Sequence, residues 1–346
     1  MSRFSQENIV DVPRLNTLDK LEFEESYLRK GKPVVITAGL DGLACSKWSI
    51  DYLLERVGLN NVTVRGRTNS DEYKVGKQYI IRETTFREYI SDMRAKSVRG
   101  LTSYMAVQNI SKTFPQLQDD CKIPDIGKLH NGPFLWVAHK GHYEYCHYDP
   151  DASLLMMIEG SKRVKLFSCI DLEKMYPNPL GSRGKTIQSQ VDCDNVDLEK
   201  FPKFSEVTCY SCTLQAGDLL LIPAFWWHQV TSLSDSVSMN AFFGESGEDR
   251  YITRIMEEPV WPSFKYWLLN IVEQNRPFAS FERTLQRLPL CVENLLLKQF
   301  HEVAPQSHVN KLVETIKEYL NLVALPEFNG GGKNPPPLRV RGLRWR

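Results

Sequence analysis

Short runs of apolar residues, some continuous, as at residues 154–158, and some alternating with polar residues, fill the middle of the chain from about residue 134 to residue 243. A period of two is typical of β-strands, and turn residues such as Gly160 and Gly217 separate several of the runs. The predicted strands are residues 134–138, 143–148, 154–158, 163–167, 208–214, 218–222 and 237–243. Such a series predicts an all-β sandwich, barrel or jelly roll. The polar stretch between Tyr176 and Phe204 is expected to be a long loop that could overhang the barrel mouth.

Before residue 130 the pattern changes between strand-like and helix-like segments. The strand-like segments are residues 32–37, 61–65 and 103–107, and the helix-like segments are residues 46–56 and 85–93. No linker composition separates this region from the predicted strands. We therefore expect residues 1–125 to form an N-terminal α/β elaboration that packs on a barrel of residues 126–260.

After residue 260 apolar residues recur at three- and four-residue spacing, which predicts helices. The three apolar stripes are Trp267, Leu268, Ile271 and Val272; Leu285, Leu288, Cys291, Leu295 and Phe300; and Leu312, Val313, Ile316, Tyr319 and Leu320. The stripes could pack on the chain's own core or form a homodimer, and the pattern does not separate these alternatives. We expect a helical region over residues 261–325, followed by a disordered, basic, Gly/Pro-rich tail over residues 326–346.

The composition is that of an ordinary globular protein, with 42% hydrophobic residues, 25% charged residues and a net charge of +1. This charge gives no global field that would attract nucleic acid or a membrane, although it does not exclude a local basic patch. We find no signal-peptide core and no apolar run of about 18 residues. The eight cysteines are scattered, as is typical of reduced thiols. A cytoplasmic or nuclear protein is the expectation.

Two histidines and one carboxylate form a candidate metal site. His147 and Asp149 end one predicted strand, and His228 follows another after the residues Pro-Ala-Phe-Trp-Trp. Two imidazoles and a carboxylate make up the facial triad that binds non-haem Fe(II) and leaves positions open for a cosubstrate and oxygen. A His-x-Asp sequence is short and arises by chance, so the alternative is a set of loop or core residues.

Strand parity predicts which neighbours share a face with His147. Residues two apart on a strand point the same way, so Tyr143, Tyr145 and Asp149 should lie with His147 and face inward. By the same rule Glu144 should point away from them. The parity therefore separates Glu144 from the candidate metal ligands.

Lys162 stands just after the turn at Gly160 and at the start of a predicted strand. A cation in this place suits the distal carboxylate of a keto-dicarboxylate that chelates the metal. The alternative is a surface lysine, like its neighbours Arg163 and Lys165.

Longer blocks of sequence resemble a known family. The blocks are residues 147–149, 158–167, 188–204, 214–228 and 238–242. Taken together and in order, they resemble the JmjC-type, cupin-like Fe(II)/2-oxoglutarate-dependent dioxygenases, over about residues 10–325. The resemblance implies a β-rich α+β protein with a double-stranded β-helix (jelly-roll/cupin JmjC) core, an N-terminal α/β elaboration and C-terminal helices.

The resemblance also implies the site and its cofactors. It assigns the iron ligands to His147, Asp149 and His228, and the cosubstrate contacts to Lys162, Tyr104, Ser153 and Asn240. Ser153 stands where relatives often carry asparagine, and it can still donate one hydrogen bond. The cofactors implied are Fe(II), the cosubstrate 2-oxoglutarate and O2. The implied reaction hydroxylates a substrate while 2-oxoglutarate is converted to succinate and CO2.

One departure from the family concerns Glu144, which stands where several relatives carry a serine or threonine donor. A carboxylate that faces 2-oxoglutarate would repel it, so either Glu144 points away or binding is weakened. Tyr145 or Tyr143 could supply the missing hydroxyl group. Weakened binding would leave a JmjC interaction module that is catalytically weak or silent.

The small hydroxylase group of this family acts on macromolecules. Residues 12–15, 32–36, 46–53 and 209–228 look most like the tRNA wybutosine-synthesising hydroxylase, and residues 188–204 look equally like the hypoxia-inducible-factor asparaginyl hydroxylase. We expect a tRNA modified base as substrate slightly ahead of a protein side chain.

Other functions are less favoured. Lysine demethylation ranks lower because no chromatin-reading motif accompanies the barrel, and a cupin with another metal and non-oxidative chemistry is a further alternative. Only a few basic residues near the predicted site could approach tRNA: Lys128, His130, His139, Lys140 and His142.

Overall fold

The computed structural model describes residues 8–17, 19–67, 80–95, 102–126, 128–182, 186–244, 251–274, 281–300 and 302–323. The chain divides into two compact units, one of residues 1–178 and 186–246, and a second of residues 179–185 and 247–346. The tail expected over residues 326–346 lies outside the described residues. The domain boundaries expected from the sequence, after residues 125, 260 and 325, stay predictions.

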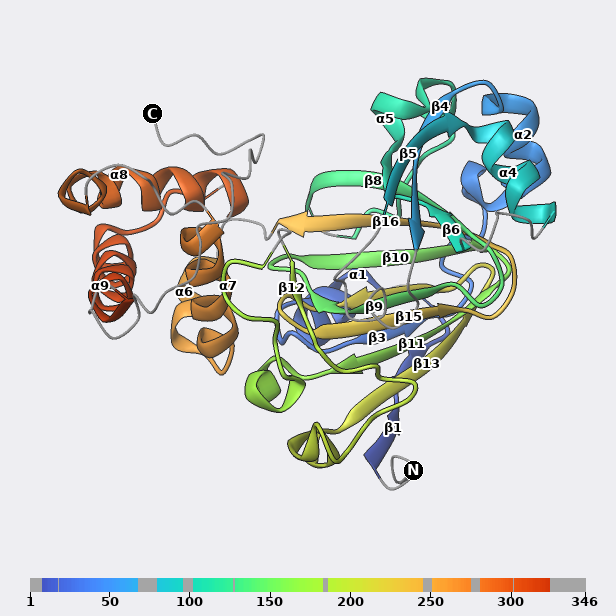
Figure 1. The fold of residues 1–346 in the computed structure, drawn as a ribbon. Coiled ribbons are helices and arrows are strands. Elements are labelled where there is room, and N and C mark those ends of the chain that lie inside the picture. The colour runs from blue at the N-terminus through green and yellow to red at the C-terminus, as the bar shows by residue number, and fades with distance from the viewer. Residues whose placement is uncertain are drawn as a thin grey trace. The chain divides into compact units, whose positions relative to one another are not determined.

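Two β-sheets form the centre of the first unit (Figure 1). The six-stranded sheet has the order β1 (Ile9–Asp11), β13 (Cys209–Gln215), β11 (Ser161–Phe167), β15 (Trp227–Ser232), β9 (Tyr143–Tyr148) and β12 (Ile187–Gln188). The seven-stranded sheet has the order β2 (Arg14–Leu15), β3 (Val34–Ile36), β14 (Leu219–Ile222), β10 (Ala152–Glu159), β16 (Ser236–Gly244), β8 (Lys128–Ala138) and β7 (Gln108–Asn109). The expected jelly-roll core is confirmed.

Strand β10 shows how the alternation of side chains builds two cores. Leu155 and Met157 belong to a cluster that includes Val164 and Leu166 of the opposite sheet, so they face the interior between the two sheets. Leu154 and Met156 point the other way and belong to the cluster under the N-terminal elements. Because β10 is covered on both faces, its run of apolar residues has the pattern of a fully buried strand.

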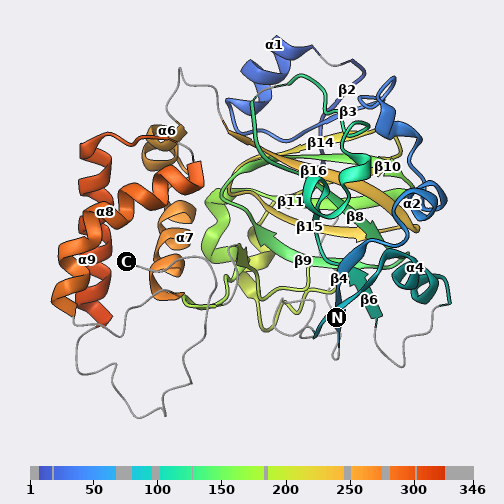
Figure 2. The same ribbon diagram turned by 90° about the horizontal axis from the view of Figure 1, so that it is seen from above.

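The N-terminal elements cover the outer face of the larger sheet (Figure 2). They include the sheet β5 (Ile80–Thr85), β4 (Asn61–Arg67) and β6 (Thr102–Met105) and the helices α1 (Lys20–Glu22), α2 (Ile50–Val57), α4 (Phe86–Ala95) and α5 (Ile110–Thr113). Short 3-10 or π-helical turns lie at Phe23–Leu28, Ala44–Lys47, Pro115–Leu117, Cys169–Met175 and Pro202–Glu206. Helix α2 begins where Ser49 accepts a hydrogen bond from the backbone N–H of Tyr52, as an N-cap does.

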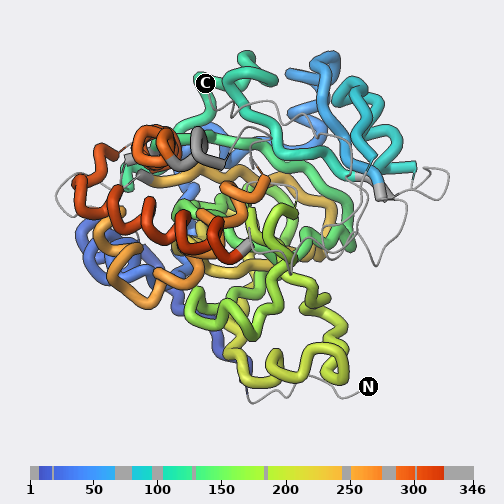
Figure 3. Tube along the Cα trace, turned by 60° about the vertical axis from the view of Figure 1, so that its left-hand side comes forward, coloured from blue at the N-terminus to red at the C-terminus, as the bar shows by residue number. Residues whose placement is uncertain are grey.

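The second unit contains the helices α6 (Tyr251–Glu257), α7 (Trp261–Gln274), α8 (Phe281–Phe300) and α9 (Gln306–Val323), which Figure 3 draws in orange and red. The rings of Trp267 and Phe300 lie 5.8 Å apart, and Leu288, Leu312 and Ile316 are buried. Burial therefore accounts for these members of the apolar stripes, and the stripes do not by themselves indicate a homodimer. None of the described helices has the length and apolar character needed to cross a membrane.

The structure corrects two expectations about strands. His228 was expected after the end of a strand, in a stretch with no predicted strand, but it lies on a strand of its own, β15. The stretch between Tyr176 and Phe204 was expected to be a loop, but it contains β12, which pairs with β9 so that Gln188 lies opposite His147. Both strands were missed because their flanking prolines, asparagines and tryptophans do not alternate with a period of two.

Candidate metal centre and cosubstrate site

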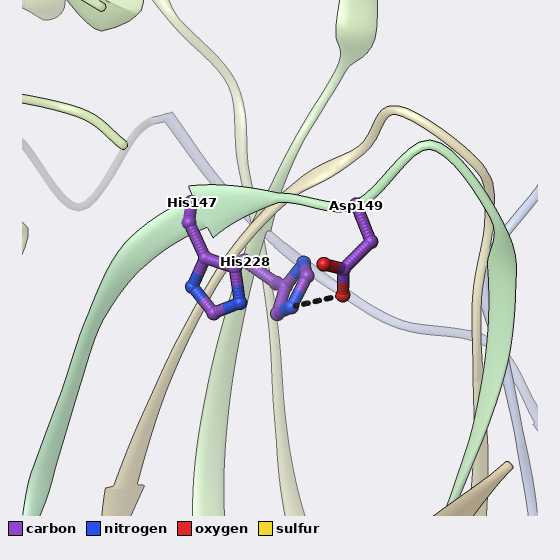
Figure 4. A group of neighbouring side chains, drawn as sticks. All are labelled: His147, Asp149 and His228. Atoms are coloured by element: carbon purple, nitrogen blue, oxygen red, sulfur yellow. Dashed lines mark ion pairs between the residues drawn. The ribbon is translucent and has the colours of Figure 1, made fainter. Parts of the chain in front are cut away.

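The pairing of β9 with β15 brings the three candidate ligands together. His147 and His228 lie directly opposite each other in the register, and their ring centroids are 4.3 Å apart. Asp149 follows β9, and its Oδ2 lies 3.7 Å from Nε2 of His228. One ligand atom from each residue lies within 4.8 Å of the others, and Figure 4 shows the three side chains pointing toward one another.

Backbone carbonyl groups fix the orientation of both imidazoles. Nδ1 of His147 lies 2.8 Å from the carbonyl oxygen of Tyr145, and Nδ1 of His228 lies 3.0 Å from that of Trp226. A carbonyl oxygen only accepts, so each Nδ1 carries the hydrogen and donates it. Each Nε2 is then left with a lone pair that can bind a metal ion.

The electrostatics of the cluster favour a neutral histidine beside a carboxylate. Burial, with a smaller contribution from the nearby His147, lowers the pKa of His228 to about 3, although the hydrogen bond to the carbonyl of Trp226 opposes the shift. Burial also raises the pKa of Asp149, against the effect of His147 and together with the negative charge of Glu144. A bound cation would offset the cost of an ionised Asp149 in this place.

These residues fit a divalent transition metal held on one face. Ligand bonds of about 2.1 Å at right angles place neighbouring donor atoms about 3 Å apart. The separation of 3.7 Å between His228 and Asp149 is close to that value. His228 is buried, whereas His147 and Asp149 are partly exposed, so solvent reaches the cluster at His147 and Asp149.

The turn before β15 has a strained backbone and is hydrogen-bonded to the segment that carries Asp149. Phe225 has a φ of 60°, which is unusual for a side chain of this size, and its N–H donates to the carbonyl oxygen of Asp149 at 2.8 Å. The rings of Phe225 and Trp227 pack against Tyr148 at centroid distances of 5.8 and 4.6 Å. The aromatic residues before His228 thus anchor the turn on the strand that carries His147.

The parity argument for Glu144 was wrong because β9 contains a bulge. His147 lies opposite His228, but Glu144 lies opposite Val230. Between these two pairs β9 therefore advances by three residues and β15 by only two. Val230 and His228 share one face of β15. Glu144 therefore points to the same interior face as His147 instead of away from it.

The placement of Tyr143 was also wrong. Its hydroxyl oxygen accepts a hydrogen bond from the backbone N–H of Cys193 at 3.1 Å, on the outer side of β9. Tyr145 lies within the bulge, with its ring 5.3 Å from that of His147. Of the two tyrosines suggested as hydroxyl donors, Tyr145 is the one that lies beside a candidate iron ligand.

Glu144 is held in place by His142. The Oε2 atom of Glu144 lies 3.2 Å from Nε2 of His142, and both side chains are more than nine-tenths buried. Burial raises the pKa of Glu144, but the hydrogen bond that His142 donates, together with the electrostatic effects of His142, His147 and Arg65, outweighs burial and lowers the pKa. Glu144 is therefore an ionised carboxylate inside the barrel.

Lys162 points to the same interior face. It lies two residues before Val164 on β11, and Val164 pairs with Val230, the residue opposite Glu144. Its Nζ donates to Oγ of Ser238 at 2.6 Å. Burial lowers the pKa of Lys162 to about 8, with the charge of Glu144 opposing the shift. Lys162 is a buried interior lysine, not a surface residue.

Sequence reasoning missed Arg65, which lies on β4 in the N-terminal part of the first unit. Its Nη1 donates to the hydroxyl oxygen of Tyr104 at 3.2 Å, and the ring of Tyr104 lies 4.2 Å from that of His142. The available signal was weak: Val62 and Val64 are buried, and Arg65 occupies the alternate face of the same short strand. Nothing in the local pattern distinguishes such a position from a solvated one.

Ser153 and Asn240 lie on neighbouring interior strands of the larger sheet. Ser153 shares the face of Leu155 on β10, and Asn240 lies opposite Leu155 on β16. Oδ1 of Asn240 accepts a hydrogen bond from Nε1 of Trp136 at 2.7 Å. The structure thus places both residues on the barrel interior, while their roles stay predictions.

Comparison with known proteins defines the family. A family model described as a cupin-like domain matches residues 20–249. The chain belongs to the cupin-like family of JmjC type. The resemblance stated from the sequence motifs is confirmed.

Two kinds of relative stand out among the known proteins. The chain is 30% identical over 250 residues to tRNA wybutosine-synthesizing protein 5 of Homo sapiens, a match that covers 67% of this chain and 77% of that protein. It is 30% identical over 237 residues to lysine-specific demethylase 8 of Xenopus tropicalis, covering 66% of this chain and 52% of that protein. A match to lysine-specific demethylase JMJ30 of Arabidopsis thaliana covers 65% and 53%, at 31% identity. The chain thus spans about half the length of these demethylases.

Proposed function

We propose that this chain is an Fe(II)- and 2-oxoglutarate-dependent dioxygenase that hydroxylates a macromolecular substrate. The observation that carries the proposal is the convergence of His147, Asp149 and His228, with both imidazoles oriented by backbone carbonyl groups. Loop or core histidines would not need two free Nε2 atoms aimed at one carboxylate. Membership of the JmjC-type family supports the same assignment.

The chain's residues would hold the cofactors as follows. His147, Asp149 and His228 would bind Fe(II) and leave one side of it open. Iron with bound 2-oxoglutarate and O2 supplies the chemistry that inserts an oxygen atom into a C–H bond. Lys162, buried and protonated at neutral pH, would bind the distal carboxylate of 2-oxoglutarate, with the hydroxyl group of Tyr104 as a further donor.

The apolar interior protects this chemistry from water. Leu155 and Ile222 belong to the buried cluster between the sheets, and Phe242 packs edge-on against Phe134 at 5.9 Å. Side chains of this kind would exclude bulk water from the interior between the sheets, toward which Lys162 points. Excluding water strengthens the interaction of Lys162 with an anionic cosubstrate.

A tRNA modified base of the wybutosine type is the slightly favoured substrate, because the chain covers more of the tRNA relative than of the demethylases. The structure gives less support for tRNA than the sequence did, because two of the basic residues named from the sequence are buried or nearly so. His142 is buried against Glu144, and His130 lies 3.7 Å from Asp151 with a side chain only 10% exposed. A protein side chain, hydroxylated or demethylated, is therefore the second candidate. The cytoplasmic or nuclear location stays a prediction.

The experiment that separates the substrates compares two panels with one enzyme preparation. Purified protein with Fe(II), 2-oxoglutarate and O2 is incubated with tRNA from wybutosine-hydroxylase-deficient cells and with peptides that carry asparagine or methylated lysine. We expect a mass increase of one oxygen atom on tRNA. Peptide hydroxylation or demethylation without any change in tRNA would reverse the order. No change in either panel, with no succinate formed, would favour a silent interaction module or a cupin with non-oxidative chemistry.

A further inference from the structure

Glu144 places a buried carboxylate beside the residues that we propose for the cosubstrate. The bulge in β9 turns it to the interior face that also carries Lys162. Its partner His142 donates Nε2–H, and because burial lowers the pKa of His142, this imidazole is neutral. The contact therefore satisfies the carboxylate as a hydrogen-bond acceptor but does not cancel its negative charge.

A second carboxylate brought by 2-oxoglutarate would be repelled by this charge. Like charges a few ångströms apart in a partly desolvated site weaken binding strongly unless a cation compensates. Lys162 alone would then serve two carboxylates, Glu144 and the ligand. The site needs another positive charge if it is to bind a dicarboxylate well.

Arg65 supplies such a charge from β4, outside the barrel strands. A continuous chain of contacts joins it to Glu144: Nη1 of Arg65 donates to Tyr104 at 3.2 Å, the rings of Tyr104 and His142 lie 4.2 Å apart, and His142 donates to Glu144 at 3.2 Å. Burial lowers the pKa of Arg65, but Tyr104, Tyr145 and Glu144 raise it further than burial lowers it. The guanidinium thus stays charged, and its field reaches Glu144.

We propose that Arg65 and Glu144 form a compensating charge pair that determines how tightly the site binds the distal carboxylate of its 2-oxo acid, an inference that rests on the proposed function. Arg65 offsets the buried carboxylate, so that Lys162 remains available for the ligand. Both are specificity-determining residues, because they act on the charge of the cosubstrate and not on the reacting atoms. The pair explains how a chain with glutamate in place of a neutral hydroxyl can still accept 2-oxoglutarate.

A double-mutant cycle tests the pair directly by calorimetric titration of 2-oxoglutarate into Mn(II)-loaded protein under anaerobic conditions. Arg65→Gln should weaken 2-oxoglutarate binding by about tenfold or more, because Glu144 then acts unopposed. Glu144→Gln keeps an oxygen that accepts from His142 and should tighten binding by about threefold or more. The double variant should return to within about threefold of the wild-type affinity, since both charges are gone.

Two matched controls separate charge from structure. Arg65→Lys keeps the positive charge and should stay within about threefold of the wild-type affinity. The ligand 2-oxopentanoate, which carries a methyl group in place of the distal carboxylate, should bind all variants with equal affinity. Mn(II) binding and thermal unfolding are measured on each variant and should match the wild type.

The outcomes distinguish the pair from the function on which it rests. If Arg65→Gln weakens 2-oxoglutarate binding equally with Glu144 and with glutamine at position 144, the two residues are not coupled and the proposal is wrong. It is also wrong if 2-oxopentanoate responds to the substitutions as 2-oxoglutarate does. If the wild type and every variant bind Mn(II) but none binds 2-oxoglutarate, the proposed function fails first, and the pair fails with it.

Discussion

His147 and His228 are oriented as ligands by the protein alone. Each Nδ1 donates to the carbonyl oxygen two residues earlier, at 2.8 and 3.0 Å, so the metal-binding nitrogen needs no rearrangement. Such preorganisation reduces the free-energy cost of metal binding. A single residue also explains why the predicted orientation of Glu144 was wrong. One extra residue in β9 turns Glu144 from the outer face of the strand to the inner face.

At the residue scale, the pKa of Lys162 predicts a pH profile. Burial lowers this pKa to about 8, and only the ammonium form binds an anion well. The affinity of the Mn(II)-loaded protein for 2-oxoglutarate should therefore be constant below about pH 7 and fall by up to about tenfold per pH unit above pH 8. Titration calorimetry between pH 6.5 and 9.5 measures this profile.

The matched variants for this profile are Lys162→Arg and Lys162→Ala. Arginine stays charged throughout the range, so its affinity should not change between pH 7 and 9.5. Alanine should raise the 2-oxoglutarate requirement at every pH. An identical fall in wild type and Lys162→Arg, or an unchanged requirement in Lys162→Ala, would show that another group binds the distal carboxylate.

At the scale of elements, the sequence predicted the strands well where alternation is regular. It identified β9, β10 and β11 and the three candidate ligands, because these strands alternate or are fully apolar and end in recognisable turns. It did not predict the bulge, because one extra residue leaves the local pattern of Tyr143–Tyr148 unchanged and is decided by the pairing with β15. The positions of these strands along the chain were therefore predictable, but the face on which Glu144 lies was not.

The segment that carries β12 provides a test of how the ligand strand is supported. Oγ of Ser189 donates to the carbonyl oxygen of Met175 at 2.6 Å and accepts from the N–H of Val191 at 3.0 Å, and Ser189 is fully buried. Ser189→Ala should lower the free energy of unfolding by about 1–3 kcal/mol, since two buried backbone groups lose their partner. Urea unfolding followed by tryptophan fluorescence measures the loss.

Ser205→Ala is the matched control for this substitution. Ser205 is exposed, and its Oγ also donates to a backbone carbonyl, that of Pro202 at 2.7 Å. Water can replace this partner, so the loss should stay within about 0.5 kcal/mol. Equal losses for the two serines would mean that the buried contacts of Ser189 do not hold this segment on β9.

At the scale of the whole molecule, the charge balance of the site depends on contacts between residues far apart in the chain, which the sequence could not show. Arg65 reaches Tyr104 and, through it, the His142–Glu144 pair, although β4 and β9 are far apart in the chain. Tyr104 and Lys162 were predicted from a family resemblance, whereas Arg65 has no motif to mark it. Composition and periodicity indicate the fold class, but the charge balance of the site depends on how separate elements meet.

The most direct test of the central claim is the formation of succinate from 2-oxoglutarate by the purified protein, measured with and without Fe(II) and O2. We predict release that requires both and that is lost in His147→Ala and Asp149→Ala, while thermal unfolding of the metal-free variants stays close to that of the wild type. His308→Ala, which removes an imidazole from the second unit, should leave the rate unchanged. A wild-type rate in either ligand variant, or release without Fe(II), would contradict the assignment of His147, Asp149 and His228 as the iron site.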